Sequence, residues 1–464
     1  MTQSISAARQ VCGQHQQEHL LAWWDRLDEP RRAELLSQIE ALDWPTIERM
    51  RAELVAERDT TGSAAFEAAD AVHPPAAEQA QARATGEAAL RAGEVGVILV
   101  AGGQGTRLGF DAPKGTFAIG PLSGASLFEI HARKILAAER RSGCPLPFYI
   151  MTSHANDADT RRFFAERRFF GLDPARVMFF TQGMLPALWP DGRIVLESPS
   201  RIFLGPDGHG GLLDALRRTG MLDDMRRRGL ATLFYFQVDN PLVEIAEPAF
   251  LGLHVLHRAQ MSIKVCAKRD PEEGLGVIVR RKDRLGIVEY TDPLLTHNMK
   301  IDRRPNGDLL FKYGSVAIHV FARTFLESEA DAGLPLHRAH KKVPYCDAEG
   351  HTVKPKKENA YKSEKFIFDA LPDAERSLAV EFDREEEFSP VKHATGADSP
   401  ETTRRGMMVK FARWLEACGV EVPRLPDGSL RYRIEIDPLY ADNAAELRAR
   451  LPAGFRIEGD TYLH

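Results

Sequence analysis

A glycine-rich loop with two cationic side chains is the part of the sequence best suited to chemistry. Gly102, Gly103 and Gly105 allow the backbone to approach an anion closely, because glycine has no Cβ. Arg107 can bind phosphate oxygens with two parallel N–H groups, and Lys114 adds a compact positive charge. The loop therefore predicts a polyphosphate site, with an ordinary glycine-rich turn as the alternative.

Two familiar kinds of nucleotide loop are excluded by the residues that follow. No Gly-Lys-Ser/Thr stands at P-loop spacing, and residues 103–108 lack the third glycine of the dinucleotide fingerprint G-x-G-x-x-G. A nucleoside triphosphate loop of another kind is therefore expected.

Asp239 is the carboxylate best placed to act with this loop. It follows the apolar run 233–238 and precedes Asn240 and Pro241, where the chain must turn away from a strand. Magnesium needs only one or two protein carboxylates when phosphate oxygens complete its shell. We therefore expect Asp239 to bind Mg²⁺, the alternative being that its side chain only caps the following segment.

Further polar segments have two readings each. Residues 204–212 hold four glycines and His209 ahead of a helix, which favours an anion. Five lysines lie within 354–368, and one or two could reach phosphate. Phe366 and Phe368 alternate as on a strand, flanking a sugar or filling the core. The acidic run 385–387 is expected to be a solvated face or a cap rather than a metal site.

These residues must be positioned by an α/β framework. Apolar runs alternate with helical patterns, which is typical of a parallel sheet whose ligands collect at the carboxyl ends of its strands. The expected strands are 95–100, 147–152, 177–182 and 232–238, and the expected helices lie near 126–140, 157–168 and 212–228.

The remaining sequence predicts more antiparallel strands and two flanking domains. The later strands are 262–268, 276–281, 286–290 and 309–320, with Asn306-Gly307 as a hairpin signal. The predicted division is a helical N-terminal domain (1–94), a central α/β domain that carries the glycine-rich loop and Asp239 (95–397) and a small α+β C-terminal domain (398–464). Within the first, Trp23 and Trp24 are expected to anchor a core, and residues 71–82 to form a linker.

Composition limits the possible partners. The 464 residues carry a net charge of −5, so no global field favours nucleic acid or an anionic membrane. We find no apolar run of 18 residues and no leader pattern, which predicts a cytoplasmic enzyme. The five cysteines are far apart and encode neither a zinc site nor a disulfide framework. Oligomeric state is not encoded in any pattern that we recognise.

Eight motifs occur in the same order as in a known family. They closely resemble those of the eukaryotic-type UDP-N-acetylhexosamine pyrophosphorylases, within the wider UDP-sugar pyrophosphorylase family. The motifs occupy residues 100–109 with 113–115, 149–153, 182–187, 206–211, 238–240, 288–290, 361–369 and 387–392. The resemblance implies a Rossmann-like (nucleotidyltransferase, GT-A-like) fold with a mixed, mostly parallel sheet.

The resemblance also implies roles for individual residues. Catalytic contacts with phosphate would come from Arg107, Lys114, Lys362 and Lys392. The nucleotide would contact Val100, Ala101, Gly102, Gly103, Lys114, Gln182, Gly208 and Asp239, with Gln182 and Gly208 reading the uracil and Asp239 holding Mg²⁺. The sugar would contact His209, Gly276, Glu289, Ser315, Phe366 and Phe368.

The implied reaction joins UTP and N-acetylglucosamine 1-phosphate into UDP-N-acetylglucosamine and pyrophosphate. His209 and Ser315 stand where the family usually has Asn, so a UDP-glucose or broad-specificity pyrophosphorylase stays open. A nucleotide-sugar-binding regulator or a glycosyltransferase is the alternative from another class. Asp239-Asn240 lacks the second Asp of the Asp-x-Asp metal motif typical of such transferases.

Overall fold

The computed structural model describes residues 4–55, 66–290, 292 and 295–464. Contacts between residues divide these into two compact units. Unit 1 comprises the described residues within 1–63, 182–212 and 333–369, and unit 2 comprises those within 64–181, 213–332 and 370–464.

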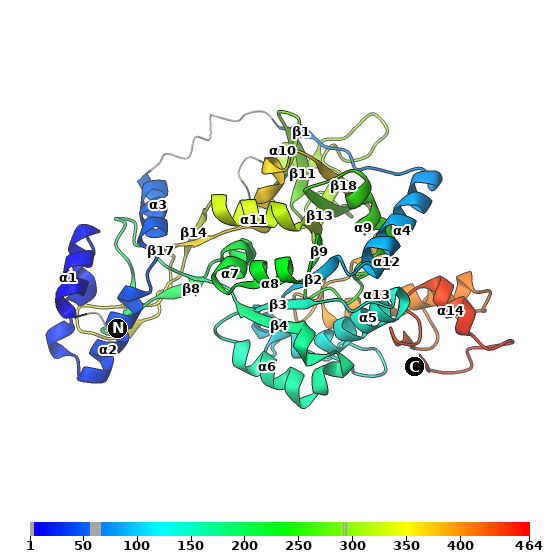
Figure 1. Cartoon of the computed structure of the whole chain (residues 1–464), viewed down its shortest axis with the longest axis horizontal. Helices are drawn as coiled ribbons and strands as arrows, with labels where there is room; N and C mark the ends of the chain where they lie inside the picture. The colour runs from blue at the N-terminus through cyan, green and yellow to red at the C-terminus, as the bar shows by residue number, and fades with distance from the viewer. Residues whose placement is uncertain (1–3, 56–65, 291, 293–294) are drawn as a thin grey trace. The chain divides into compact units, whose positions relative to one another are not determined.

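Unit 2 is built on a mixed sheet whose centre is parallel (Figure 1). Strand β2 (Val95–Val100) lies between β9 (Thr232–Gln237) and β3 (Phe148–Thr152), and β3 also pairs with β4 (Val177–Thr181), all in parallel. The residues of β2, β3 and β9 are almost all buried, as their apolar sequences predict, and β4 at the edge is partly buried. All four expected strands are therefore present.

Antiparallel strands extend the sheet beyond β9. They are β1 (Glu67–Ala68), β10 (Met261–Ala267), β11 (Val277–Arg281), β12 (Arg284–Val288) and β13 (Tyr313–Ala322). The edge strand β18 (Ser377–Glu381) pairs with β10 in parallel. The order β1-β11-β13-β9-β2-β3-β4, together with the helices, confirms the mixed α/β fold class.

Helices of unit 2 follow the parallel strands as expected, with one correction. Helix α5 (Leu127–Ser142) is capped by Ser126, and α6 is Asp157–Glu166. The single helix expected over 212–228 is wrong, because Gly220, in the left-handed region (φ 73°), separates α7 (Leu212–Arg218) from α8 (Met221–Arg227).

The linker expected over 71–82 is also wrong in its second half. Pro75 is the N-cap residue of α4 (Ala76–Arg91), which packs against α9 (Pro248–Leu256). A Cβ at Gly86 would lie 1.8 Å from the Pro248 carbonyl oxygen, and one at Gly252 1.6 Å from that of Ala82. The paired glycines therefore bring the two backbones together, which a reading of Pro-Pro as a linker missed.

Unit 1 combines N-terminal helices with short hairpins from later in the chain. The helices are α1 (Ile5–Gln14), α2 (Glu29–Glu40) and α3 (Trp44–Val55). The strand pairs are β5 (Met184–Pro186) with β8 (Leu204–Pro206), β6 (Leu196–Ser198) with β7 (Arg201–Ile202), β14 (His337–Lys341) with β17 (Ala360–Glu364), and β15 (Tyr345–Cys346) with β16 (Thr352–Val353).

The core of unit 1 joins these distant segments. Leu20 and Leu35 of the N-terminal region share one apolar cluster with Leu185, Ile194 and Leu336, and Trp23 and Trp24 pack against it. The two tryptophans are thus core anchors, as expected. The units do not follow the predicted boundaries at 94 and 397, because the N-terminal helices bury their apolar faces against later segments of the chain.

The C-terminal segment has an apolar cluster of its own within unit 2. It includes α13 (Pro400–Ala417), β19 (Ile434–Ile436), α14 (Ala444–Arg450) and β20 (Thr461–Leu463). The carboxylate of Glu435 accepts hydrogen bonds from the backbone N–H groups of Leu122 and Ser123, at 2.6 and 2.7 Å. These bonds fasten the segment to the loop that precedes α5.

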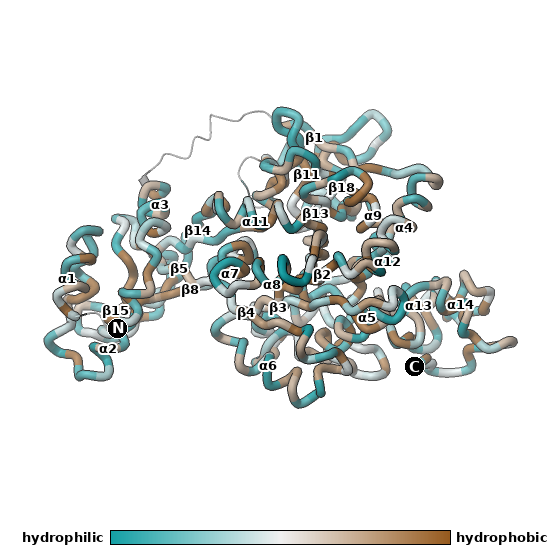
Figure 2. Tube along the Cα trace, viewed as in Figure 1, coloured by the Kyte–Doolittle hydropathy of each residue, from teal (hydrophilic) through white to brown (hydrophobic). Residues whose placement is uncertain are grey.

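The shorter helices of unit 2 complete the framework. They are α10 (His297–Ile301), α11 (Arg323–Ala332) and α12 (Arg384–Glu387). Asn306 and Gly307 do form a tight turn, but it joins an isolated bridge between Arg303 and Leu309 rather than two long strands. Figure 2 shows hydrophobic residues along α9, which packs on α4. Within the described residues, no helix is long and apolar enough to cross a membrane.

Candidate active site

The glycine-rich loop leaves the carboxyl end of β2 and is held by a neighbouring asparagine. The Asn156 side chain donates to the carbonyl oxygens of Ala101 (3.0 Å) and Gly103 (3.3 Å). A Cβ at Gly105 would lie 2.7 Å from the Phe110 carbonyl oxygen, whereas one at Gly103 would meet nothing within 4 Å. Gly105 is therefore required for the fold of the loop itself, whereas the space beside Gly103 is open.

The two cations of the loop differ in environment. Arg107 is exposed, and its carbonyl oxygen accepts from the N–H of Ala394 at 3.1 Å. Lys114 follows Pro113 in a short 3₁₀ turn, and its Nζ lies 3.2 Å from Oδ2 of Asp239. A Cβ at Gly115 would lie 2.2 Å from the Phe128 ring, so Gly115 lets the turn pack on α5. The loop cation and the carboxylate after β9 are therefore in direct contact.

Asp239 is held as a carboxylate by nearby cations. Burial favours the neutral acid, but the charges of Lys114 and Lys392 outweigh it and leave the pKa of Asp239 below its usual range. Lys392 Nζ also lies 3.5 Å from Oδ2 of Asp398. His131 donates from Nε2 to the carbonyl of Val238 at 3.0 Å, which supports the backbone just before Asp239. Asp239 thus forms one electrostatic cluster with Lys114 and Lys392, two cations that are predicted to bind phosphate.

Three predicted sugar-binding residues of unit 2 lie at one end of the antiparallel strands. The N–H of Ser315 on β13 donates to the carbonyl of Gly276 at 2.9 Å. Val277 pairs with Val288, which places Gly276 beside Glu289, and a Cβ at Gly276 would come within 2.8 Å of the Ile287 side chain. Gly276, Glu289 and Ser315 are therefore brought together.

The predicted uracil contacts lie in unit 1. Gln182 is buried and immediately precedes Gly183, whose carbonyl accepts from the N–H of Asp207. Gly208 has a φ of 83°, and a Cβ there would lie 2.5 Å from the Lys365 carbonyl oxygen. Both the positive φ and the close carbonyl oxygen require glycine at position 208.

His209 and the two phenylalanines form an aromatic group in unit 1. The N–H of Ile367 donates to Nδ1 of His209 at 3.2 Å, so the neutral ring carries its proton on Nε2. Its centroid lies 5.3 Å from that of Phe366 and 5.7 Å from that of Phe368. Burial, helped by the charge of His337, lowers the pKa of His209 to about 4. His209 is therefore neutral near pH 7 and presents a donor.

The strand reading of the two phenylalanines is wrong. Strand β17 ends at Glu364, and a 3₁₀ turn begins at Ile367, so Phe366 and Phe368 follow the strand and stack on each other at 5.2 Å. His337 on β14 completes this group, with its ring 4.6 Å from Phe366 and its Nε2 2.7 Å from Oδ2 of Asp369.

Lys362 is the remaining predicted phosphate cation. It lies on β17, opposite Ala339 of β14, with its Nζ 4.6 Å from the centre of the Phe203 ring. Burial lowers its pKa, although the charge of Glu364 opposes this. A bound anion would stabilise a partly buried ammonium group beside an aromatic face, which is consistent with the predicted phosphate contact.

Several residues of these groups were missed by the sequence analysis. Asn156, Asn240 and His131 hold backbone at the strand ends, and His337 extends the aromatic group. Asn240 had a signal, since it follows Asp239 at a strand end. The other three had none, because they lie far in sequence from the groups that they support.

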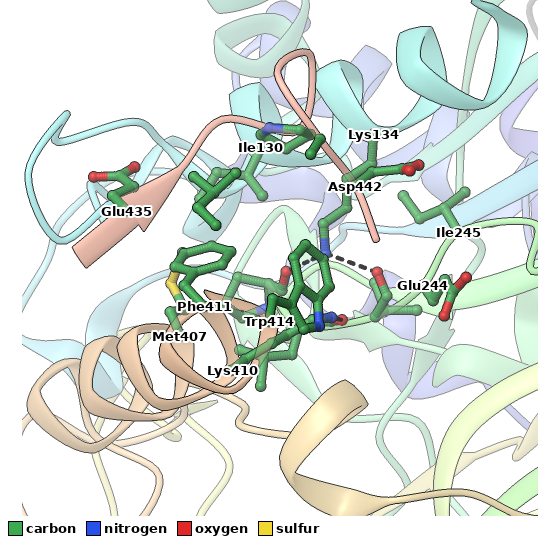
Figure 3. A pocket seen from close by; sticks show the side chains of 16 residues that line it. Ile130, Lys134, Glu244, Ile245, Met407, Lys410, Phe411, Trp414, Glu435 and Asp442 are labelled. Atoms are coloured by element: carbon green, nitrogen blue, oxygen red, sulfur yellow. Dashed lines mark hydrogen bonds between the residues drawn. The ribbon is translucent and has the colours of Figure 1, made fainter. Parts of the chain in front are cut away.

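A pocket elsewhere in unit 2 contains none of the predicted site residues (Figure 3). It lies beside the segment that follows Asp239 and is lined by Pro241–Ile245, α13 and residues near β19. Lys134 donates to the carbonyls of Pro241 and Val243, and Lys410 donates to that of Leu242 at 3.1 Å. The two lysines thus hold the backbone of the turn after Asp239.

Comparison with known proteins decides the family. The family model described as UTP–glucose-1-phosphate uridylyltransferase matches residues 36–399. The chain belongs to this family. The resemblance seen in the motifs is thereby confirmed. The chain is a member of an enzyme family and has the α/β fold that is expected for it.

Relatives in this family carry hexosamine names. The human UDP-N-acetylhexosamine pyrophosphorylase-like protein 1 is 36% identical over 97% of this chain and 94% of its own length. UDP-N-acetylglucosamine diphosphorylase 2 of Arabidopsis thaliana is 35% identical over 93% and 89%. The crystal structure of the uridine diphosphate N-acetylglucosamine pyrophosphorylase from Trypanosoma brucei, in complex with inhibitor, aligns with a TM-score of 0.79, 27% identity and 98% coverage of both chains.

Proposed function

We propose that this protein is a uridylyltransferase that converts UTP and N-acetylglucosamine 1-phosphate into UDP-N-acetylglucosamine and pyrophosphate. The observation that carries this proposal is the contact between Lys114 of the glycine-rich loop and Asp239 at the carboxyl end of β9. It joins a cation that is predicted to bind phosphate to a carboxylate at the edge of the sheet where ligands collect. The names of the relatives support the same reaction.

The triphosphate of UTP would bind along the glycine-rich loop. Asn156 holds the loop backbone, and the open side of Gly103 leaves room for phosphate oxygens. Arg107 and Lys114 would neutralise their charge. The uracil would be read by the side-chain amide of Gln182, which can both donate and accept, and by close approach to Gly208.

The environment of Asp239 fits a magnesium ion. Its carboxyl group is kept ionised, and a single carboxylate suffices when phosphate oxygens supply other ligands. Glu244, Glu247 and Glu387 form the one group of three close metal-ligand side chains among the described residues, but the ammonium group of Lys264 contacts Glu247 and Glu387, so a cation already lies at this group. We therefore assign Mg²⁺ to Asp239, where it would polarise the phosphates when bound.

The chemistry needs positioning and charge neutralisation rather than a covalent enzyme intermediate. The sugar phosphate supplies the nucleophilic oxygen, which attacks the α-phosphorus of UTP while the bond to pyrophosphate breaks in line. Lys114 and Arg107 would stabilise charge on the leaving pyrophosphate, and Lys362 and Lys392 would meet the remaining phosphate oxygens. All four side chains would act as fixed cations and transfer no proton.

The sugar remains the open part of the proposal. Glu289 would accept from sugar hydroxyls, and the aromatic faces of Phe366 and Phe368 would pack against the ring. His209 presents a fixed Nε2–H donor where the hexosamine enzymes usually have Asn. A preference for glucose 1-phosphate, or for several sugar phosphates, is therefore the second candidate.

Pyrophosphate release from UTP and Mg²⁺ tests these candidates with a panel of sugar 1-phosphates. N-acetylglucosamine 1-phosphate should give the highest kcat/KM, and glucose 1-phosphate is the competitor to include. If none of the sugar phosphates leads to release of pyrophosphate, the reaction is contradicted, and a nucleotide-sugar-binding regulator or a glycosyltransferase is favoured. A cytoplasmic location remains part of the proposal.

A further inference from the structure

We propose that Asn240 is a positioning residue that fixes Lys392 relative to Asp239. This inference rests on the proposed roles of those two residues, Lys392 toward phosphate and Asp239 toward Mg²⁺. Asn240 follows Asp239 directly, is only 4% exposed, and has no role in the binding of UTP or sugar assigned above.

The side chain of Asn240 is bonded to the segment that leads to Lys392. Its Nδ2 donates to the carbonyl of Glu387 at 2.6 Å, and its Oδ1 accepts from the N–H groups of Ser389 (3.2 Å) and Leu242 (3.3 Å). Backbone groups thus use both ends of the amide. Asparagine is the small side chain that can donate and accept in this way.

A further bond fixes the same segment to the backbone of the carboxylate residue. The N–H of Val391 donates to the carbonyl of Asp239 at 2.9 Å. Lys392 is the next residue, and its charge is one of those that lower the pKa of Asp239. Asn240 and this backbone bond therefore act on the short segment that ends at Lys392.

Glu387 anchors the beginning of the segment. The acidic run 385–387 was expected to be solvated or to cap a helix, and for Glu387 a solvated role is wrong because its side chain is buried. Lys264 of β10 contacts its carboxylate, whose Oε2 also accepts from the N–H of Glu244 at 3.2 Å. A buried, bonded glutamate gives Asn240 a fixed partner, whereas a solvated one would not.

The turn on the other side of Asn240 is held as well. The carbonyls of Pro241, Leu242 and Val243 accept from the ammonium groups of Lys134 and Lys410. Figure 3 shows both lysines among the residues that line the pocket beside this turn. Because the two lysines hold this turn independently of Asn240, removal of the amide should let the Lys392 segment shift while the turn stays in place.

A double-mutant cycle on UTP binding tests the inference. The dissociation constant of UTP with Mg²⁺ is measured by calorimetry for wild type, Asn240→Ala, Lys392→Met and the double variant. Each single change should weaken binding about tenfold, and the double variant should be no more than about threefold weaker than Lys392→Met alone, because Asn240 acts through Lys392. Independent, multiplicative losses would overturn the inference.

Two further variants separate positioning from general destabilisation. Asn240→Ser is uncharged and keeps a small polar group for the N–H of Leu242 while it loses the amide donor to Glu387, so it serves if Asn240→Ala does not fold. Asn443 caps α14, far along the chain, by accepting from the N–H of Glu446 at 3.0 Å. Asn443→Ala should lower Tm with an unchanged dissociation constant for UTP. If Asn240→Ser lowers Tm and leaves that constant unchanged as well, Asn240 is only structural.

The binding measurement also separates this inference from the proposed reaction. An enzyme that binds UTP but releases no pyrophosphate with any sugar phosphate would contradict the reaction, while the cycle would still report on Asn240. Additive losses in an enzyme that does release pyrophosphate would contradict only the role of Asn240.

Discussion

The ammonium group of Lys114 lies 3.2 Å from a carboxylate oxygen of Asp239, and both side chains are about 85% buried. The residues are 125 positions apart in the sequence, one in the glycine-rich loop and the other after β9. Partly buried opposite charges hold one another in place and keep the carboxylate ionised. Substitutions of either partner should therefore have different but related consequences.

Lys114→Met should lower kcat/KM for UTP by about 10²- to 10³-fold, the loss typical when one group that stabilises transition-state charge is removed. Pyrophosphate release measures the loss. Lys357→Met, at an exposed lysine, is the matched control and should retain activity. Near-normal turnover of Lys114→Met would remove Lys114 from the phosphate site.

Asp239→Asn should weaken the dependence of UTP binding on Mg²⁺. A neutral amide keeps the shape of the side chain but is a poor ligand for a hard cation. Calorimetric titration with UTP, with and without Mg²⁺, should show a large effect of the ion in wild type and little in the variant. An equal effect of Mg²⁺ in both proteins would place the metal elsewhere.

Gly103→Ala and Gly115→Ala should separate binding from stability. The Phe128 ring occupies the place of a Cβ at Gly115, so Gly115→Ala should lower the free energy of unfolding by about 1–3 kcal/mol. Gly103 has open space beside it, so Gly103→Ala should keep Tm and weaken UTP binding. Thermal melts and UTP titrations of both variants give the comparison, and unweakened UTP binding by Gly103→Ala would contradict the predicted loop contact.

His209→Asn combined with Ser315→Asn should raise the preference for N-acetylglucosamine 1-phosphate over glucose 1-phosphate. An Asn at 209 can accept from the N–H of Ile367 and still present its amide, so the local structure should persist. The ratio of the two kcat/KM values measures the preference. His340→Asn, at an exposed histidine outside the predicted site, is the control; an unchanged ratio in the double variant would show that the two positions do not govern the sugar.

His131 should make the protein less stable in acid. Burial lowers its pKa to about 3, while the unfolded chain has a histidine pKa of about 6.5. The unfolded state then binds more protons between these values, so the contribution of His131 is complete above about pH 6.5 and is lost progressively as pH falls towards 3. Urea unfolding gives the free energy of unfolding at each pH from 7 to 5. Its slope against pH should be smaller in a folded His131→Gln variant than in wild type, by up to about 1.4 kcal/mol per pH unit. Equal slopes would contradict the assignment.

The sequence by itself determined the parallel strands and the places of the glycine-rich loop and Asp239 at their ends. Residues 95–100 and 232–238 are apolar without alternation, which is typical of strands covered on both faces, and the loop and Asp239 follow them directly. Such local patterns also predicted a helix near 126–140, which the structure shows as α5 with Ser126 as its N-cap. The co-linear motifs then indicated the family, because each is a short stretch of neighbouring residues.

Only the tertiary structure decided which distant residues support one another. The burial of Glu387 depends on Lys264, which is 123 residues away, and the helices α4 and α9 meet through glycines that no local pattern connects. The N-terminal helices share a core with residues near 194 and 336 for the same reason. Burial and pairing depend on which segments meet after folding, whereas a charge run or a Pro-Pro step reports only local preference.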